Sequence, residues 1–290
     1  MVNHSLQYKE NLTESSPSAA PDSVETQDFS THLDLSRITV PKKIAHLKAG
    51  YTLCSNGEIL ILQDGVTALQ IRNRTLVPQH LQWNRGLIRD ICWSSLRHVF
   101  IFLCQKRVYS FDPTNPESET NKFQDILPYE EKDSFWKCSC IQSSLYICYS
   151  GYATSVEEYD LSSSTPTLKK RWISPKSCLA TEGIWAIQCH QDQIGLTIMD
   201  VTTKEWRIEV RNMKLKKLWD LKIPITTGDC ELTLLPNNDW LVINSCGNRL
   251  FQISDRKMKV AVQYERELKN AVMFADKFFI VRTKNTIEIH

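Results

Sequence analysis

Histidine, cysteine and serine side chains are the groups of this chain most able to bind a metal or act as nucleophiles. The seven histidines form no H-x-x-x-H pair, and the sequence contains neither a G-x-S-x-G nor a G-x-x-x-x-G-K-[ST] motif. Ten cysteines are present, but no two of them form a C-x-x-C pair, so the usual spacing of zinc ligands is missing. We therefore expect no catalytic residue, no metal and no cofactor.

Composition and charge exclude further classes of protein. The 290 residues carry a net charge of +2, which argues against nucleic-acid binding driven by a strong positive field. The sequence has no run of about 18 apolar residues that could cross a membrane. Its first twenty residues also lack the apolar stretch of a secretory signal. We expect a cytoplasmic monomer that binds no membrane and whose net charge does not favour nucleic acid.

Residues 1–29 and 30–290 differ in composition. Ser, Thr, Glu and Pro dominate the first segment, which we predict to be a disordered tail. The second segment repeats a sequence pattern that is marked by a three-residue anchor. Successive anchors are 38, 48, 49, 46 and 39 residues apart. The anchors are Cys54-Ser-Asn, Cys92-Trp-Ser, Cys140-Ile-Gln, Cys189-His-Gln, Leu235-Pro-Asn and Phe274-Ala-Asp.

Each anchor is followed by short segments with the period of two that is typical of β-strands. An apolar second strand comes first, as in Val99–Leu103 and Leu145–Tyr149, and an alternating third strand follows it. Leu168–Trp172 and Leu215–Trp219 share four of five residues, which predicts fourth strands with matched tryptophans. Four short strands at this period are typical of a β-propeller blade.

The two ends of the repeat predict how the ring closes. The last repeat stops at His290 after its third strand, whereas Leu33–Val40 alternates apolar and polar residues before the first repeat. Pairing of the two would complete the last blade and leave no exposed sheet edge. The sequence therefore predicts an all-β, six-bladed β-propeller whose N-terminal strand completes the last blade.

One repeat carries a family resemblance. Arg89–Ser94, Val99–Leu103 and Arg107–Asp112 together resemble a blade of the degenerate WD-repeat-like β-propellers. The resemblance covers about residues 31–290 and concerns architecture. It implies a non-catalytic platform that presents peptides and partner proteins on one rim, although a fold alone does not fix a function.

Basic residues in the connections from second to third strands form the main candidate binding site. They are Lys106, Arg107, Lys204, Arg249 and Lys284. The connections from fourth to first strands share that face and add Lys42, Lys43, Arg85 and Lys176.

Two tryptophans belong to the same candidate site. Trp136 and Trp185 stand at the start of innermost strands, near the rim of the central channel, where aromatic side chains often anchor partners. We expect this basic, aromatic-flanked face to bind an acidic peptide or partner protein.

Two other functions stay open at this point. A channel-mouth hydrolase of the six-bladed type would use calcium, yet Glu231 and Asn270 alone do not supply its 6–8 oxygen ligands. The same basic face could instead bind RNA. Cys54, Cys92, Cys140 and Cys189 recur at one position of successive repeats, which favours a packing role between blades.

Overall fold

The computed structural model describes residues 33–38, 40–115, 121–123, 125–225 and 228–290. All of them belong to one unit, which spans residues 32–290. The tail predicted for residues 1–29 lies outside the described residues.

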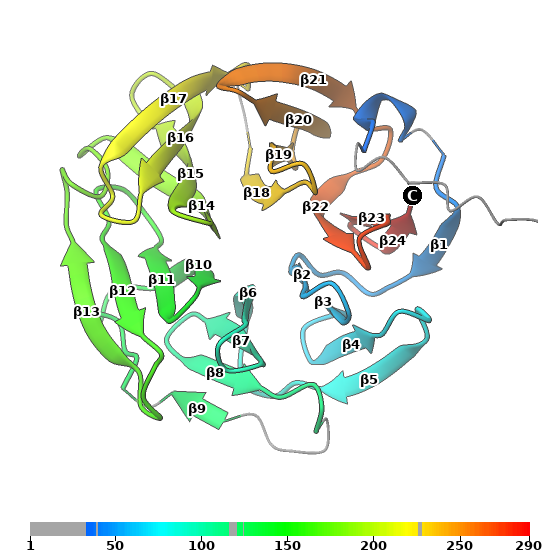
Figure 1. Cartoon of the computed structure of the whole chain (residues 1–290), viewed down its shortest axis with the longest axis horizontal. Helices are drawn as coiled ribbons and strands as arrows, with labels where there is room; N and C mark the ends of the chain where they lie inside the picture. The colour runs from blue at the N-terminus through cyan, green and yellow to red at the C-terminus, as the bar shows by residue number, and fades with distance from the viewer. Residues whose placement is uncertain (1–32, 39, 116–120, 124, 226–227) are drawn as a thin grey trace, which may run out of the picture. The chain divides into compact units, whose positions relative to one another are not determined.

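Six four-stranded antiparallel sheets form a ring of blades (Figure 1). Blade 1 consists of β2 (Leu53–Ser55), β3 (Leu60–Gln63), β4 (Ala68–Arg72) and β5 (Pro78–Gln82). Blade 2 consists of β6 (Ile88–Ser94), β7 (Val99–Cys104), β8 (Val108–Phe111) and β9 (Asn121–Phe123). Blade 3 consists of β10 (Phe135–Ile141), β11 (Ser144–Tyr149), β12 (Val156–Asp160) and β13 (Thr167–Trp172).

The remaining three blades follow the same plan. Blade 4 consists of β14 (Glu182–His190), β15 (Gln193–Asp200), β16 (Trp206–Asn212) and β17 (Lys217–Ile223). Blade 5 consists of β18 (Cys230–Leu234), β19 (Trp240–Asn244), β20 (Arg249–Ser254) and β21 (Lys257–Gln263). Blade 6 consists of β22 (Leu268–Phe274), β23 (Phe278–Thr283), β24 (Thr286–Ile289) and, from the other end of the chain, β1 (Lys43–His46). The predicted six-bladed propeller is confirmed.

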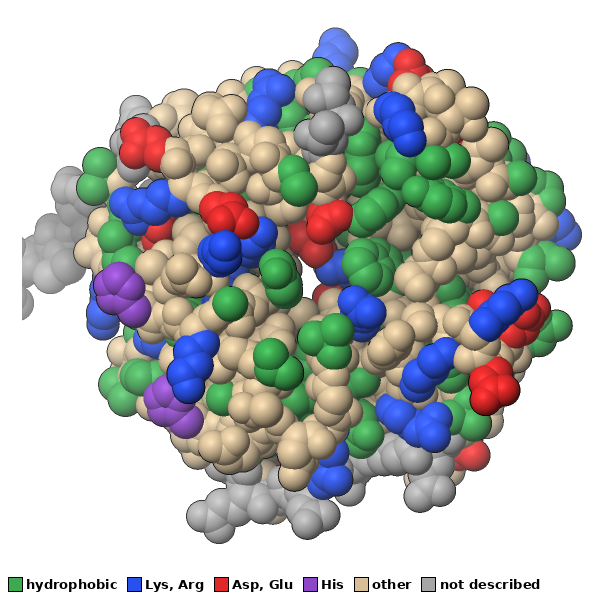
Figure 2. Space-filling model, turned by 180° about the vertical axis from the view of Figure 1, so that it is seen from behind, with side chains coloured by type: hydrophobic (Ala, Val, Ile, Leu, Met, Phe, Trp, Pro, Cys, Tyr) green, Lys and Arg blue, Asp and Glu red, His purple; other side chains and the backbone are tan. Residues whose placement is uncertain are grey.

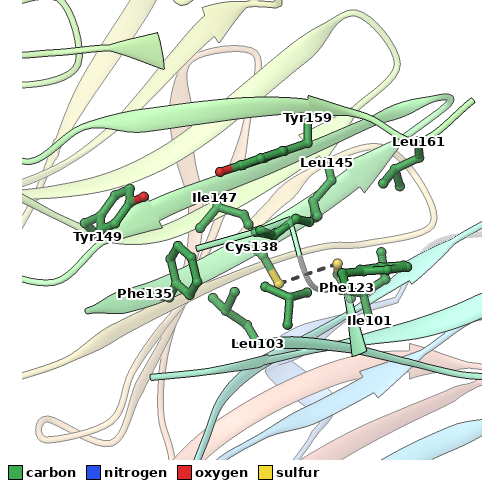
Figure 3. Close-up of a cluster of buried hydrophobic side chains, with 13 residues drawn as sticks. Ile101, Leu103, Phe123, Phe135, Cys138, Leu145, Ile147, Tyr149, Tyr159 and Leu161 are labelled. Carbon is green, nitrogen blue, oxygen red and sulfur yellow. Dashed lines mark hydrogen bonds between the residues drawn. The ribbon is translucent and has the colours of Figure 1, made fainter. Parts of the chain in front are cut away.

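Burial explains why the strands of one blade differ in composition. All residues of β11 and β19 are buried, because a second strand is covered by a neighbouring blade on each side. The outer strand β21 alternates between exposed and half-buried residues, because only one of its faces packs. Six hydrophobic clusters result, each shared by two adjacent blades. Figure 3 shows the cluster between blades 2 and 3, where Leu103 and Phe123 meet Phe135 and Ile147.

A strand from the N-terminal segment completes the last blade, as predicted, but it spans residues 43–46 and not 33–40. β1 pairs with β24 from Lys43 opposite Ile289 to His46 opposite Thr286. Within the predicted strand 33–40, Leu35–Arg37 forms a 3-10 helix, η1, in which the Asp34 side chain accepts a hydrogen bond from the backbone N–H of Ser36. Leu35 and Ile38 are three residues apart, which brings both to one side of the turn. They are buried in the cluster between blades 5 and 6.

The two similar segments do not occupy matched positions. Trp172 ends β13, opposite Val156, whereas Trp219 lies near the start of β17, opposite Val210. Leu215 belongs to the preceding turn and has a positive φ of 57°. Four shared residues therefore reflect similar composition of outer strands and not the same register.

The two faces of the ring carry different connections. We call the side with the second-to-third and fourth-to-first connections the top face, and the opposite side the bottom face. β1 ends at His46, beside the top-face turn between β23 and β24. Its first residue, Lys43, therefore lies at the bottom face. Lys42 and Lys43 therefore do not belong to the top face, contrary to the prediction.

Candidate partner-binding site at the channel mouth

β-bulges shape the mouth of the central channel on the top face. The innermost strands of four blades each contain one residue that breaks the pairing with the second strand. These residues are Arg89 in β6, Trp136 in β10, Trp185 in β14 and Lys269 in β22. An unpaired bulge residue turns its side chain away from the regular pleat. The same local irregularity thus recurs in blades 2, 3, 4 and 6.

Every blade, or the connection that leads into it, contributes at least one residue to the lining of the cavity at this mouth. The cavity has a volume of about 240 Å³. We call six of these residues the mouth ring; in blade order they are Tyr51, Arg89, Trp136, Trp185, Asp229 and Lys269. Leu87 also lines the cavity and is 42% exposed. The mouth ring therefore combines aromatic walls with two cations and one acid.

Contacts between neighbouring blades hold the mouth ring in place. The indole N–H of Trp136 donates to the backbone carbonyl oxygen of Trp185 at 3.1 Å, and the two rings meet edge to face at 5.8 Å. The guanidinium of Arg89 lies 5.5 Å from the ring centre of Trp136. The ammonium of Lys269 lies 5.3 Å from the ring centre of Tyr51. Both cations are thus positioned over aromatic faces, where the ring attracts them.

Arg89 differs from the other cations of the site. Its Nε is buried and has no hydrogen-bond partner among the described residues. Lys269 is paired with Glu267 at 2.7 Å. A buried, unpaired N–H group is unfavourable unless a ligand supplies an acceptor. Arg89 therefore adds to the mouth ring a half-buried guanidinium whose Nε–H lacks an acceptor among the described residues.

A buried ion pair forms the floor of the mouth cavity. The ammonium of Lys137 in blade 3 bonds across the channel to the carboxylate of Glu231 in blade 5. Both residues also line a second cavity of about 250 Å³, which we call the inner chamber. The pair thus separates the mouth cavity from the inner chamber.

A third charge, Asp90, belongs to this floor. Burial lowers the pKa of Lys137, but the nearby carboxyls of Glu231 and Asp90 outweigh it and raise that pKa. Burial raises the pKa of Asp90 and of Glu231, while Lys137 opposes the shift in both. The ammonium of Lys137 therefore attracts two carboxyl groups, those of Glu231 and Asp90, at a position that is shielded from water.

The predicted basic residues lie on the top face but outside the mouth cavity. Lys106 donates to the backbone carbonyl oxygens of Glu131 and Asp133, and Arg249 donates to that of Pro224 at 3.2 Å. Arg107 and Lys204 are exposed, and Lys284 lies 4.0 Å from Glu267. Trp136 and Trp185 line the mouth cavity, and their role in partner binding stays a prediction. Sequence reasoning missed Arg89 as a site residue, because a bulge leaves no mark in composition.

Exposed hydrophobic side chains concentrate on the same face. Eight of the fourteen large hydrophobic side chains that are exposed among the described residues belong to top-face connections. They are Tyr51, Val66, Leu87, Leu127, Tyr129, Tyr152, Ile173 and Leu179. Only Val77 and Leu96 belong to bottom-face turns. Figure 2 shows the top face, with hydrophobic side chains and charged side chains of both signs around the central opening and further charges toward the edge.

The residues required by the hydrolase alternative are engaged elsewhere. The Glu231 carboxylate is bound to Lys137, and the side-chain oxygen of Asn270 accepts from the backbone N–H of Ala271 at 2.8 Å. Among the residues that the structure describes, no group of three or more His, Cys, Asp or Glu side chains is placed to hold a metal ion. Within the same residues, no helix has the length and apolar character needed to span a membrane.

Comparisons with known proteins show the fold. No protein-family model matches the chain, and no significant match occurs among the curated proteins. A chain of the crystal structure of the Mitotic Checkpoint Complex is similar with a TM-score of 0.60 at 9% identity, over 96% of this chain and 98% of that one. The WD40 β-propeller domain of Doa1 has a TM-score of 0.56 at 10% identity, over 86% of this chain and 96% of that one.

A third solved structure adds no function. A Bacteroides caccae protein of unknown function has a TM-score of 0.55 at 10% identity, over 83% of this chain and 82% of that one. At these identities the likeness concerns architecture, and at that level the predicted WD-repeat-like resemblance is confirmed. These likenesses show the propeller fold of the chain.

Proposed function

We propose that the protein is a non-catalytic, monomeric scaffold whose top face binds an acidic peptide or an acidic segment of a partner protein. The observation that carries the proposal is the mouth ring, in which the guanidinium of Arg89 lies beside aromatic walls and its Nε–H has no partner among the described residues. Binding of this kind needs a rigid frame that presents loops, and six interlocked blades provide it.

Arg89 supports the acidic character of the partner. A carboxylate that reached the mouth would pair with the half-buried guanidinium of Arg89, in a place where partial burial strengthens the attraction. Stacking on Trp136 already fixes the guanidinium, so little side-chain freedom is lost on binding. Asp229 lies across the mouth and would repel the same ligand, which limits where a carboxylate can lie.

The apolar residues support a partner that also contributes a hydrophobic side chain. Trp136, Trp185 and Leu87 wall a cavity whose floor is closed by the Lys137–Glu231 pair. A cavity of about 240 Å³ accommodates a side chain and not a folded segment. We therefore expect a leucine or phenylalanine beside the acidic residue. The outer cations, Lys106, Arg107, Lys204, Arg249 and Lys284, would attract such a partner at longer range.

Binding to synthetic peptide arrays tests the proposal. Full-length protein is applied to peptides in which one Leu or Phe is flanked by Asp and Glu, by Lys and Arg, or by Ser and Gly. We expect retention on the acidic set, and a loss of roughly 30-fold or more in affinity for Arg89→Ala and for Trp185→Ala, as for residues at the centre of an interface. Leu96→Ala and Arg256→Ala on bottom-face turns are the matched controls and should bind normally.

Two results would overturn the proposal. Equal binding of acidic and basic peptides would remove the role of Arg89. Normal binding by both mouth-ring variants would move the site elsewhere. Single-stranded RNA is measured in parallel, and RNA retention with a steep loss on added salt would favour the nucleic-acid alternative.

A further inference from the structure

Three thiols from two adjacent blades meet at the wall of the inner chamber. Cys138 and Cys140 are two residues apart on β10, so both side chains leave the strand on one side. The sulfur of Cys92 on β6 lies 3.4 Å from that of Cys140 and 3.5 Å from that of Cys138. Figure 3 shows the sulfur of Cys138 directed at a second sulfur atom within the cluster. Cys92 is the common neighbour of the other two.

We infer that Cys92 and Cys140 are a disulfide-forming pair, a covalent modification site that links blades 2 and 3 when hydrogen peroxide enters the inner chamber. The inference does not depend on the proposed function. All three thiols line the chamber, but Cys140 is the least buried of them. Peroxide therefore reaches Cys140 first, and Cys92 is the nearest thiol that can react with the product.

The reaction balances with peroxide as the only oxidant. The thiolate of Cys140 attacks peroxide, which forms a sulfenic acid and releases hydroxide. The sulfur of Cys92 then attacks the sulfenic sulfur, the S–S bond forms and water leaves. Two thiols lose two hydrogens in total, and one peroxide becomes two waters. The sulfurs must approach each other by about 1.4 Å to reach bonding distance.

The surroundings of the thiols determine the rate of disulfide formation. Burial raises the pKa of Cys140 above its ordinary value, so only a small fraction is thiolate at neutral pH. The rate of disulfide formation should therefore increase with pH. The backbone N–H of Cys138 donates to the carboxyl oxygen of Asp90 at 2.9 Å, which holds β10 against β6 while the bond forms.

Peptide mapping after oxidation tests the inference. The full-length protein carries Cys246→Ser, because Cys246 is exposed and would link separate molecules. Folded protein is treated with hydrogen peroxide, free thiols are blocked in denaturant, and trypsin releases residues 90–97 and 138–169 as separate peptides. We expect the intact mass to fall by two hydrogen masses and the two peptides to be linked. Fragmentation should place the bond at Cys140.

Single substitutions separate this pair from its neighbours. Cys138→Ser and Cys148→Ser should keep the link, whereas Cys140→Ser and Cys92→Ser should abolish it. A link that persists in Cys140→Ser would overturn the assignment. The absence of any link in folded wild-type protein would do so as well, and so would the same set of pairings in folded and denatured protein.

Discussion

The guanidinium of Arg282 donates a hydrogen bond to the backbone carbonyl oxygen of Lys48 at 2.8 Å, although the two residues are 234 positions apart. It also donates to the carbonyl oxygen of Gly50 at 3.2 Å. Arg282 is fully buried on β23, and this burial lowers its pKa to about 10. A Cβ at Gly50 would lie 2.9 Å from Arg282 Nη2, so the approach requires glycine. Blade 6 is thereby joined to the segment that leads into blade 1.

Replacement of Arg282 tests this junction. Arg282→Met should lower the free energy of unfolding by about 3 kcal/mol, because two buried carbonyl oxygens lose their charged donor. Urea titration monitored by tryptophan fluorescence measures the change. Arg74→Met is the control, since its ion pair with Glu58 is largely exposed and should contribute less than about 1 kcal/mol. Equal effects of the two variants would contradict a structural role for Arg282.

Truncation separates the contributions of the N-terminal segment. Removal of residues 1–31 should leave the melting temperature unchanged. Removal of residues 1–41 should lower it, because Leu35 and Ile38 leave the cluster between blades 5 and 6. Removal of residues 1–47 also deletes β1, so the edge of β24 becomes exposed and we expect aggregation.

Calorimetry and size-exclusion chromatography of the three truncated proteins give the measurement. A 48–290 fragment that stays monomeric with the full-length melting temperature would show that β1 does not close the ring.

The raised pKa of Asp90 makes stability depend on pH. Burial raises that pKa against the attraction of Lys137, so the folded protein binds this proton more tightly than the unfolded chain does. Asp90 therefore lowers stability as the pH rises from about 4 through its raised pKa. Asp90→Asn lacks this titration. Its free energy of unfolding relative to wild type should increase between about pH 4 and pH 7.

Asp112→Asn provides a control of opposite sign. Hydrogen bonds from Thr114 lower the pKa of Asp112, so its stabilising contribution is present at neutral pH and is lost as the pH falls through that lowered pKa. Relative to wild type, Asp112→Asn should therefore become less stable as the pH rises through this lowered pKa to about 4, and its difference from wild type should change little between about pH 4 and pH 7. Urea titrations at both pH values give the comparison, and a flat difference for Asp90→Asn would refute the prediction.

Replacement by alanine should lower the free energy of unfolding much more at Glu157 than at the adjacent Glu158 of β12. Glu157 is fully buried and accepts from Tyr149 at 2.7 Å, Tyr159 at 2.8 Å and Arg171 at 2.6 Å. Glu157→Ala leaves these donors without an acceptor and should cost about 3–5 kcal/mol.

The neighbouring residue provides the control for that substitution. Glu158 is half-buried, accepts from the Ser144 hydroxyl at 2.8 Å and is paired with the exposed ammonium of Lys169 at 3.0 Å, so Glu158→Ala should cost less, about 1–2 kcal/mol. Thermal unfolding of both variants makes the comparison, and similar losses would mean that the buried network does not stabilise blade 3.

The repeat could be predicted because burial imposes it on the sequence. Second strands are covered on both sides, so each must be continuously apolar, and Val99–Leu103 and Leu145–Tyr149 are correct for that reason. The closing strand β1 has the burial pattern of an outer strand, so Lys43–His46 shows little alternation. The apolar residues Leu35 and Ile38 were instead interpreted as part of a strand, although they are buried from the turn formed by η1.

The mouth ring could be predicted only in part. Trp136 and Trp185 stand out by residue type. Arg89 and Lys269 gain their positions from bulges, which depend on the pairing with β7 and β23 and not on local composition. The Lys137–Glu231 pair joins blades 3 and 5 across the channel, a relation that no repeat period contains.

The pairing of β1 with β24 also has a consequence for biosynthesis. A ribosome makes β1 some 240 residues before its partner, which at usual translation speeds corresponds to roughly 10–50 s. Blades 1 to 5 draw only on contiguous chain and can assemble during that interval, while β1 waits without a neighbour. Until β24 has been synthesised, the nascent protein therefore carries β1 without a strand partner. During that period a chaperone could bind β1.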